Sequence, residues 1–290
     1  MFNFFVSLII ASQLIGPISG IILSVSQNSD FGFPKRRLTN SFRPVIGAES
    51  AIVFDVASKK ILYEKEAYKA RSIASLTKLM TAIVFFEQNP DLDKSVQITQ
   101  DDKANGGKIQ LLSGEIVKLK DILNTALIGS ANNAAYELAH ATRLGYQEFI
   151  ARMNSRAREI GMKNSIFVEP TGIDPGNMST AKDVAMMLNY AMGIKEIVDA
   201  LSSASYAFQA VGGNKHYIKN TNELLGSYLK PIGGKTGYIE EAGYCLVNLI
   251  KNDQVTDGII IVILGAKSND ERFQDNKFLG QWILDNWQWE

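Results

Sequence analysis

The chain has 290 residues, of which 46% are hydrophobic and 21% are charged, which suits a globular protein that can bury a sizeable core. Basic and acidic residues number 30 each, so the overall charge gives no reason to expect a nucleic acid as partner. The single cysteine, Cys245, excludes an internal disulfide, and with only His140 and His216 beside it a zinc site is not expected. The sequence indicates a protein without metal or other cofactor.

The chain begins with an apolar segment that is followed by a polar one. Residues 2–26 carry no charge and end in small residues that suit a cleavage site, whereas glycine and proline within them disfavour a buried core helix. The basic residues at 35–37 follow this run, and none precedes it, which is unusual for an export signal. We expect residues 1–26 to be a signal peptide or a retained N-terminal membrane anchor, and residues 27–44 to be a linker. Either form would place the bulk of the chain outside the cytoplasm, in the periplasm or the cell-wall space.

From Val45 onward, the pattern predicts a sheet shared by the two ends of the chain. Two β-prone runs predict a hairpin at 50–67, two more predict strands within 243–266, and residues 271–289 read as a closing helix. Apolar residues at helical spacing predict further helices at 75–88, 118–128, 131–142, 145–160 and 180–193. This order requires one antiparallel sheet, flanked by helices, with a mostly helical lobe inserted into the chain between its strands. The expected fold class is α/β of the α+β type, in one domain at 45–290.

Ser75 and Lys78 stand three positions apart at the start of the first predicted helix, so their side chains can meet. A serine hydroxyl is a weak nucleophile unless a base lies within hydrogen-bond distance, and lysine can be that base where burial disfavours its charged form. The apolar residues around Lys78 provide such surroundings. The same pattern also occurs by chance, with the lysine reaching solvent, so the pair alone is weak support for catalysis.

Two further motifs strengthen the catalytic hypothesis. Ser130 and Asn132 occupy a short polar break between predicted helices, where either could also serve as a helix N-cap. Lys235, Thr236 and Gly237 precede a strand-like run and offer a cation, a hydroxyl and room for a close approach, although an ordinary glycine-rich turn would look the same.

In this order, Ser-x-x-Lys, Ser-x-Asn and Lys-Thr-Gly form the signature of class A β-lactamases and penicillin-binding proteins. Four blocks extend the similarity: "IASLTKLMTA", "GMKNSIFVEPTGID", "MSTAKDVAMM" and "GGKTGYIEEAGYCLV". The chain resembles the D-alanyl-D-alanine carboxypeptidases, the low-molecular-mass penicillin-binding proteins, over roughly residues 45–290. The resemblance implies a β-lactamase/transpeptidase-like fold.

The resemblance also implies a reaction on peptidoglycan stem peptides. Ser75 would attack the carbonyl between the two terminal D-alanines while Lys78 takes its proton, forming an acyl-enzyme that water then hydrolyses. β-Lactam antibiotics would acylate the same serine. Ser130, helped by Lys235, would pass a proton to the leaving amine, and Asn132 would hold the substrate or the lysine.

The Lys-Thr-Gly segment would bind the substrate. Lys235 and Thr236 would hold the terminal carboxylate through charge-assisted hydrogen bonds. Backbone N–H groups of Ser75 and Tyr238 would form the oxyanion hole. Gly237 would complete this substrate-binding segment.

Two positions depart from the family pattern. Asn133 stands where relatives often have aspartate, and we expect little effect because that position need not touch substrate. Lys267 stands where relatives commonly supply an arginine for the substrate carboxylate, with Arg272 slightly later. Because lysine holds a carboxylate as a point charge, we expect looser selection of the terminal carboxylate.

Three other functions stay open. A D,D-endopeptidase would use the same residues on cross-linked peptides. A serine β-lactamase would need a deacylating glutamate, for which Glu169 is the comparable candidate, although its surroundings match the carboxypeptidase pattern better. A non-catalytic cell-wall binding module would keep the fold without the chemistry.

The remaining residues with distinctive chemistry have structural interpretations. We expect His216 to lie in a loop and Cys245 to be a small core residue. Trp282, Trp287 and Trp289 are expected to pack the terminal helix onto the sheet.

Overall fold

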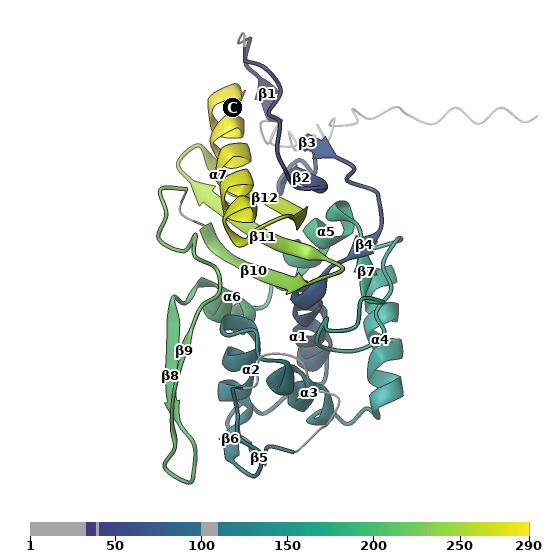
Figure 1. Cartoon of the computed structure of the whole chain (residues 1–290), viewed down its shortest axis with the longest axis vertical. Helices are drawn as coiled ribbons and strands as arrows, with labels where there is room; N and C mark the ends of the chain where they lie inside the picture. Colours follow the sequence, from purple (N-terminus) through teal and green to yellow (C-terminus); the bar gives the residue numbers. More distant parts are fainter. Residues whose placement is uncertain (1–32, 39–40, 100–109, 230, 290) are drawn as a thin grey trace, which may run out of the picture. The chain divides into compact units, whose positions relative to one another are not determined.

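The central sheet is built from both ends of the chain, as the sequence predicts. The computed structural model describes residues 33–38, 41–99, 110–229 and 231–289, so the predicted signal peptide or anchor lies outside the described residues. Five antiparallel strands lie in the order β10, β11, β12, β2, β3 (Figure 1). Their bounds are β2 Ser50–Asp55, β3 Ile61–Lys65, β10 Pro231–Ile239, β11 Gly243–Asn252 and β12 Val255–Ala266. The pairing of β2 with β12 joins the two ends in one sheet.

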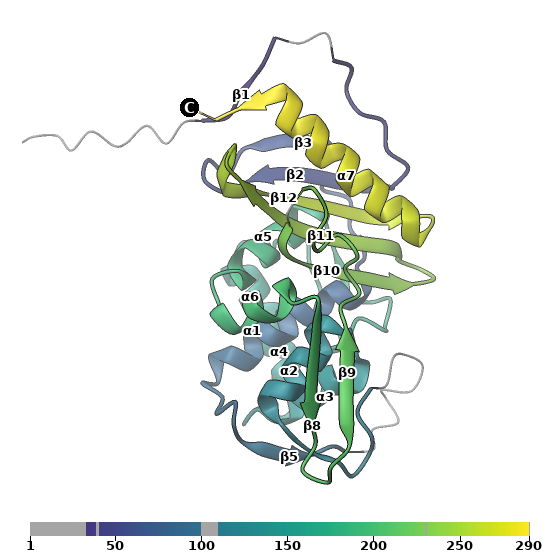
Figure 2. The ribbon, with the colours of Figure 1, turned by 90° about the vertical axis from the view of Figure 1, so that its left-hand side faces the viewer.

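Strand β12 shows why the sheet is buried on both faces. Ile259, Ile261 and Ile263 belong to one core cluster together with apolar residues of α7 (Asn269–Asn286), whereas Ile260 and Val262 belong to the core shared with the other helices. Successive side chains of a strand point to opposite faces, so a run of β-branched residues suits a strand covered on both. Figure 2 shows α7 on one face of the sheet and the remaining helices on the other.

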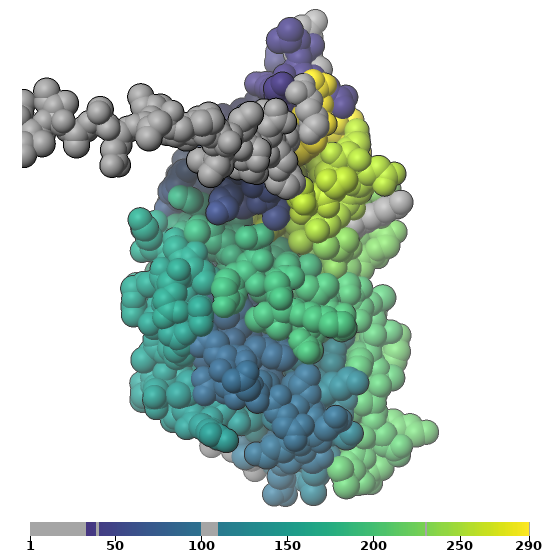
Figure 3. Space-filling model, turned by 180° about the vertical axis from the view of Figure 1, so that it is seen from behind, coloured from purple at the N-terminus to yellow at the C-terminus, as the bar shows by residue number. Residues whose placement is uncertain are grey.

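The helical layer forms close to the predicted positions. Its helices are α1 Thr77–Glu87, α2 Leu119–Ile128, α3 Asn132–His140, α4 Tyr146–Glu159, α5 Ala181–Ala191 and α6 Lys195–Ser202. The last of these was not predicted. Helix α1 is almost entirely buried, because α2, α3, α4 and α5 pack around it. From behind, side chains of the helical layer, blue to green by residue number, cover the lower part of the molecule, and the two ends of the described chain, purple and yellow, lie above them (Figure 3). Among the residues that the structure describes, no helix is long and apolar enough to cross a membrane.

Short two-stranded pairings complete the fold. They join β1 (Lys35–Arg36) to β13 (Trp287–Gln288), β4 (Arg71–Ser72) to β7 (Met178–Ser179), β5 (Ser95–Gln97) to β6 (Ile116–Lys118) and β8 (Ser205–Gln209) to β9 (Lys215–Lys219). Strand β1 falls within the range predicted as a linker. Part of that range is therefore paired with the end of the chain.

The Lys-Thr-Gly segment was predicted to precede a strand, and the structure corrects this. Residues 233–237 lie within strand β10 at the edge of the sheet. Small residues are needed there: a Cβ on Gly234 would come within 1.9 Å of Asn248 Oδ1 and 2.4 Å of Val247 O on the neighbouring strand. The glycines that resemble a turn in the sequence instead allow close strand pairing.

The end of the chain also differs from expectation. Helix α7 begins after the N-cap Ser268, whose hydroxyl accepts the Glu271 N–H at 3.0 Å, and it ends at Asn286. Trp282 packs between helix and sheet as predicted. Trp287 lies in β13 beyond the helix, although it still belongs to the same core cluster.

His216 lies in strand β9, not in a loop. Its ring stacks on Phe208 with centroids 4.6 Å apart, and its Nε2 lies 3.0 Å from Glu115 Oε1. The side chain therefore connects the β8–β9 hairpin to the segment before β6, and its contacts are structural.

Cys245 is fully buried in β11, as predicted for a small core residue. Burial raises the pKa of its thiol to about 11. At pH 8 roughly one thiol in a thousand would be ionised, so we expect negligible labelling of the native protein by an aromatic disulfide reagent. In urea the same assay should give one thiol per chain. Fast labelling of the native protein would contradict this burial.

Candidate active site

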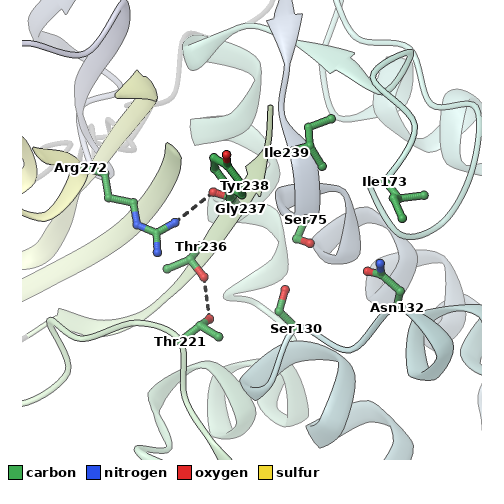
Figure 4. A pocket seen from close by; sticks show the side chains of 11 residues that line it. Ser75, Ser130, Asn132, Ile173, Thr221, Thr236, Gly237, Tyr238, Ile239 and Arg272 are labelled. Atoms are coloured by element: carbon green, nitrogen blue, oxygen red, sulfur yellow. Dashed lines mark hydrogen bonds between the residues drawn. The ribbon is translucent and has the colours of Figure 1, made fainter. Parts of the chain in front are cut away.

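The three sequence motifs meet at one pocket between the sheet and the helical layer. The pocket has a volume of about 440 Å³ and is shown in Figure 4. Its lining residues are Ser75, Ser130, Asn132, Gly172, Ile173, Thr221, Thr236, Gly237, Tyr238, Ile239 and Arg272. Segments far apart in the sequence therefore contribute polar groups to one cavity, the common arrangement of an enzyme site.

Ser75 is held in a tight turn directly before α1. It is the middle residue of the short helix η1 (Ala74–Leu76), and Ala74 has a left-handed backbone with φ of 47°. The Ala74 carbonyl accepts the Thr77 hydroxyl at 2.8 Å, which fixes this turn. A non-glycine residue with positive φ is costly and is retained where the surrounding structure requires it.

Lys78 lies in the first turn of α1 and is only 1% exposed. Its Nζ lies 2.9 Å from Ser75 Oγ, 2.7 Å from Asn132 Oδ1 and 2.7 Å from the Thr171 carbonyl oxygen. The two carbonyl oxygens can only accept hydrogen bonds. A neutral amine would give its two N–H groups to them and would direct its lone pair at the Ser75 hydroxyl. This geometry suits removal of the Ser75 proton.

A second hydroxyl–amine pair joins the other two motifs. Lys235 is 1% exposed, and its Nζ donates to Ser130 Oγ at 2.8 Å and to the Thr236 carbonyl at 3.1 Å. Ser130 precedes α3 and has a positive φ of 63°. The pocket thus holds two serine hydroxyls, each beside a buried lysine amine.

Strand β10 passes very close to the turn that carries Ser75. A Cβ on Gly237 would lie 3.0 Å from the Ile73 carbonyl and 3.1 Å from the Ser75 nitrogen. The next residue, Tyr238, is half exposed and stacks on Tyr244 with centroids 4.2 Å apart. The absence of a side chain at 237 is what allows this approach.

Arg272 and not Lys267 lines the pocket, so the structure does not place Lys267 at the substrate-binding position expected from the sequence. Arg272 extends from the first turns of α7, is 7% exposed, and donates to the carbonyls of Gly237 at 3.0 Å and Cys245 at 3.3 Å. Burial lowers the pKa of its guanidinium. Lys267 is exposed and lines a neighbouring depression. Lys267 lies before α7, whereas Arg272 lies inside the helix. Their side chains therefore start from different elements and line different pockets.

The side chains of Asn133 and Glu169 bind backbone groups of neighbouring segments, and neither residue lines the pocket. Asn133 lies outside the pocket lining, and its side chain donates to the Leu111 carbonyl at 2.7 Å. Glu169 is buried, and its carboxylate accepts the backbone N–H groups of Thr171 and Gly172. A carboxylate occupied in this way is not directed at Ser75, which weakens the comparison with a class A β-lactamase.

Two contributions to the site have no local sequence signal. The Thr171 carbonyl reaches Lys78 across 93 positions of sequence, and the Thr221 hydroxyl lies 2.6 Å from the Thr236 hydroxyl.

Within the described residues, no group of three or more His, Cys, Asp or Glu side chains could hold a metal ion.

Comparison with known proteins identifies the family. The model of peptidase family S11, D-alanyl-D-alanine carboxypeptidase, matches residues 38–268. The chain belongs to the D-alanyl-D-alanine carboxypeptidase family. It is therefore a hydrolase, a serine-type D-alanyl-D-alanine carboxypeptidase by family. Its similarity to solved structures confirms the predicted fold class.

Individual relatives cover most of the chain. A D-alanyl-D-alanine endopeptidase of Escherichia coli K12 is 34% identical over 253 residues, 84% of this chain and 80% of the relative. A D-alanyl-D-alanine carboxypeptidase of Bacillus subtilis 168 is 32% identical over 235 residues, 78% of this chain and 59% of the relative. The structure of the Streptomyces K15 DD-transpeptidase superimposes with a TM-score of 0.77 at 28% identity and covers 84% of this chain and 99% of the other.

Proposed function

We propose that this carboxypeptidase removes the terminal D-alanine of peptidoglycan stem peptides through an acyl-enzyme on Ser75. The observation that carries the proposal is the position of Lys78 Nζ, 2.9 Å from Ser75 Oγ and held from behind by two carbonyl oxygens. Lys78 takes the serine proton as Ser75 attacks the peptide carbonyl. D-Alanine leaves, and water hydrolyses the ester.

The second pair serves the leaving group. Ser130, hydrogen-bonded to Lys235, donates its proton to the departing amine and is reprotonated through the lysine. Asn132 keeps the Lys78 amine in place. The backbone N–H groups of Ser75 and Tyr238 stabilise the oxyanion, a role supported by the close approach of β10 to the Ser75 turn.

The terminal carboxylate binds between Thr236 and Arg272. The Thr236 hydroxyl and the Arg272 guanidinium both line the pocket, and Lys235 adds a nearby positive charge. Within the described residues Arg272 donates to neutral oxygens of Gly237, Cys245 and Asn269, so its charge can attract an anion. We assign to Arg272 the role that the sequence suggested for Lys267.

The test is mass spectrometry of the purified protein after incubation with benzylpenicillin, together with an assay for released D-alanine. We expect one intact penicillin on Ser75, lost slowly, and release of D-alanine from an acylated tripeptide that ends in D-alanyl-D-alanine. Rapid antibiotic turnover would favour a β-lactamase. Absence of both an adduct and peptide cleavage would favour a non-catalytic cell-wall module.

A D,D-endopeptidase is the second candidate, because the Escherichia coli relative carries that name at 34% identity. The same nucleophile would cut cross-linked stem peptides. Parallel digestion of a cross-linked muropeptide dimer and a monomeric pentapeptide separates the two activities: faster cleavage of the dimer would make the endopeptidase the main function.

The substrate requires export of the catalytic domain. The charge-free run at 2–26 supports a signal peptide or an N-terminal anchor, and we propose an extracytoplasmic location on that ground. N-terminal sequencing of protein from the native host would separate a cleaved signal from a retained anchor. Mature cytosolic protein with an intact Met1 would contradict export.

A further inference from the structure

The Thr221 hydroxyl lies in the pocket although neither the sequence motifs nor the proposed mechanism uses it. It comes from the segment that follows β9 and lies 2.6 Å from the Thr236 hydroxyl on β10 (Figure 4). Thr236 is 4% exposed, whereas Thr221 is partly exposed. The partner of the carboxylate-binding hydroxyl is therefore itself at the surface of the pocket.

The backbone on both sides of Thr221 is fixed by buried asparagines. Asn220 Nδ2 donates to the Ser203 carbonyl at 2.8 Å, and Asn222 Nδ2 donates to Asn248 Oδ1 at 2.7 Å. The Thr221 N–H donates to the Ile128 carbonyl at 3.2 Å, two residues before Ser130. These bonds hold the residue without help from its side chain, so its hydroxyl is free to serve the site.

Of the two hydroxyl hydrogens in this pair, one forms the hydrogen bond between the threonines, and the other can be donated to a ligand. Either threonine can be the donor in this pair. A carboxylate only accepts, so when it binds Thr236 the Thr236 proton must turn to it. The Thr221 proton then fills the lone pair of Thr236. Donation by one hydroxyl strengthens the next hydrogen bond in the chain, which makes Thr236 the better donor to an anion.

We propose that Thr221 is a positioning residue for carboxylate recognition: its hydroxyl orients and polarises that of Thr236 when the anionic end of a substrate binds. The proposal rests on the proposed function, since it names the group that prepares the same subsite. The Thr221–Thr236 pair then determines the specificity for a free carboxylate and takes no part in the chemical step.

The test compares acylation by benzylpenicillin with acylation by its methyl ester, followed by mass spectrometry. Thr221→Val keeps the shape and loses the hydroxyl. We expect its second-order acylation rate to fall about tenfold with the acid, because the hydrogen bond from Thr236 to the charged carboxylate is weakened, and to change less than about twofold with the ester. Thr221→Ser should restore the rate with the acid. For the tripeptide, Thr221→Val should raise KM with little change in kcat.

Thr236→Val provides the matched comparison. If Thr221 acts through Thr236, the double variant should be no slower than Thr236→Val alone. An equal fall with acid and ester, a serine variant as slow as the valine variant, or additive losses would each overturn the proposal. If the wild-type protein itself forms no adduct, the acyl-enzyme mechanism fails first and takes this inference with it.

Discussion

Replacement of Ser75 by alanine should abolish both D-alanine release and covalent labelling by benzylpenicillin. We expect kcat to fall by at least about a thousandfold, because the variant removes the group that forms the ester and leaves only binding and oxyanion stabilisation. The side chain is partly exposed at the pocket, and its Oγ contacts Lys78, so the change removes one hydroxyl without opening the core. The unfolding temperature should therefore change little.

The control for this experiment is Ser202→Ala. Ser202 is exposed at the end of α6, and its hydroxyl donates to the Asp199 carbonyl at 3.2 Å. This variant should keep the wild-type rate. Peptide hydrolysis by Ser75→Ala at an unaltered rate would exclude Ser75 as the nucleophile, and labelling mapped to Ser130 would move that role to the second hydroxyl–amine pair.

The sequence predicted the fold where apolar residues have a clear period. The β2–β3 hairpin, strands β11 and β12 and six of the helices, α7 included, lie close to where the pattern placed them. Strand β10 was missed because its small and polar residues show no alternation, and only its pairing with β11 makes it a strand. The β8–β9 hairpin was missed too. Its residues alternate in burial, but few of the inward-facing ones are apolar, such as Tyr206 and Ile218, so the sequence shows no clear alternation.

The same division holds for the site. Residues within one motif were predictable because local geometry brings them together: Ser75 and Lys78 are one helical turn apart, and their contact at 2.9 Å follows from that spacing. The Thr171 carbonyl, the Thr221 hydroxyl and the choice of Arg272 over Lys267 depend on tertiary packing. No spacing rule reaches a backbone carbonyl from a distant loop or tells which of two cations enters a pocket.

Substitution of Gly172 by alanine should reduce activity at least about a hundredfold, although Gly172 carries no reactive group. Gly172 has a φ of 85°, and a Cβ there would come within 1.9 Å of the Ala74 carbonyl oxygen and 2.8 Å of the Ser75 nitrogen. Both neighbours are backbone, so the methyl group must displace the Ser75 turn or the loop itself. That loop also carries the Thr171 carbonyl, which holds Lys78 at 2.7 Å. A shift of about 1 Å at reacting groups is enough for a loss of this size.

Gly226→Ala separates this clash from ordinary backbone strain. Gly226 has nearly the same φ, 84°, but nothing lies within 4 Å of the position that its Cβ would take. It should lose about 1 kcal/mol of stability, the usual cost of a left-handed alanine, and keep its activity within about twofold. Gly172→Ala should lose more stability than this control and, at a temperature where both variants are folded, should acylate far more slowly with benzylpenicillin. Equal acylation by the two folded variants would mean that the loop yields without moving Ser75, and that Lys78 does not depend on the Thr171 carbonyl for its position.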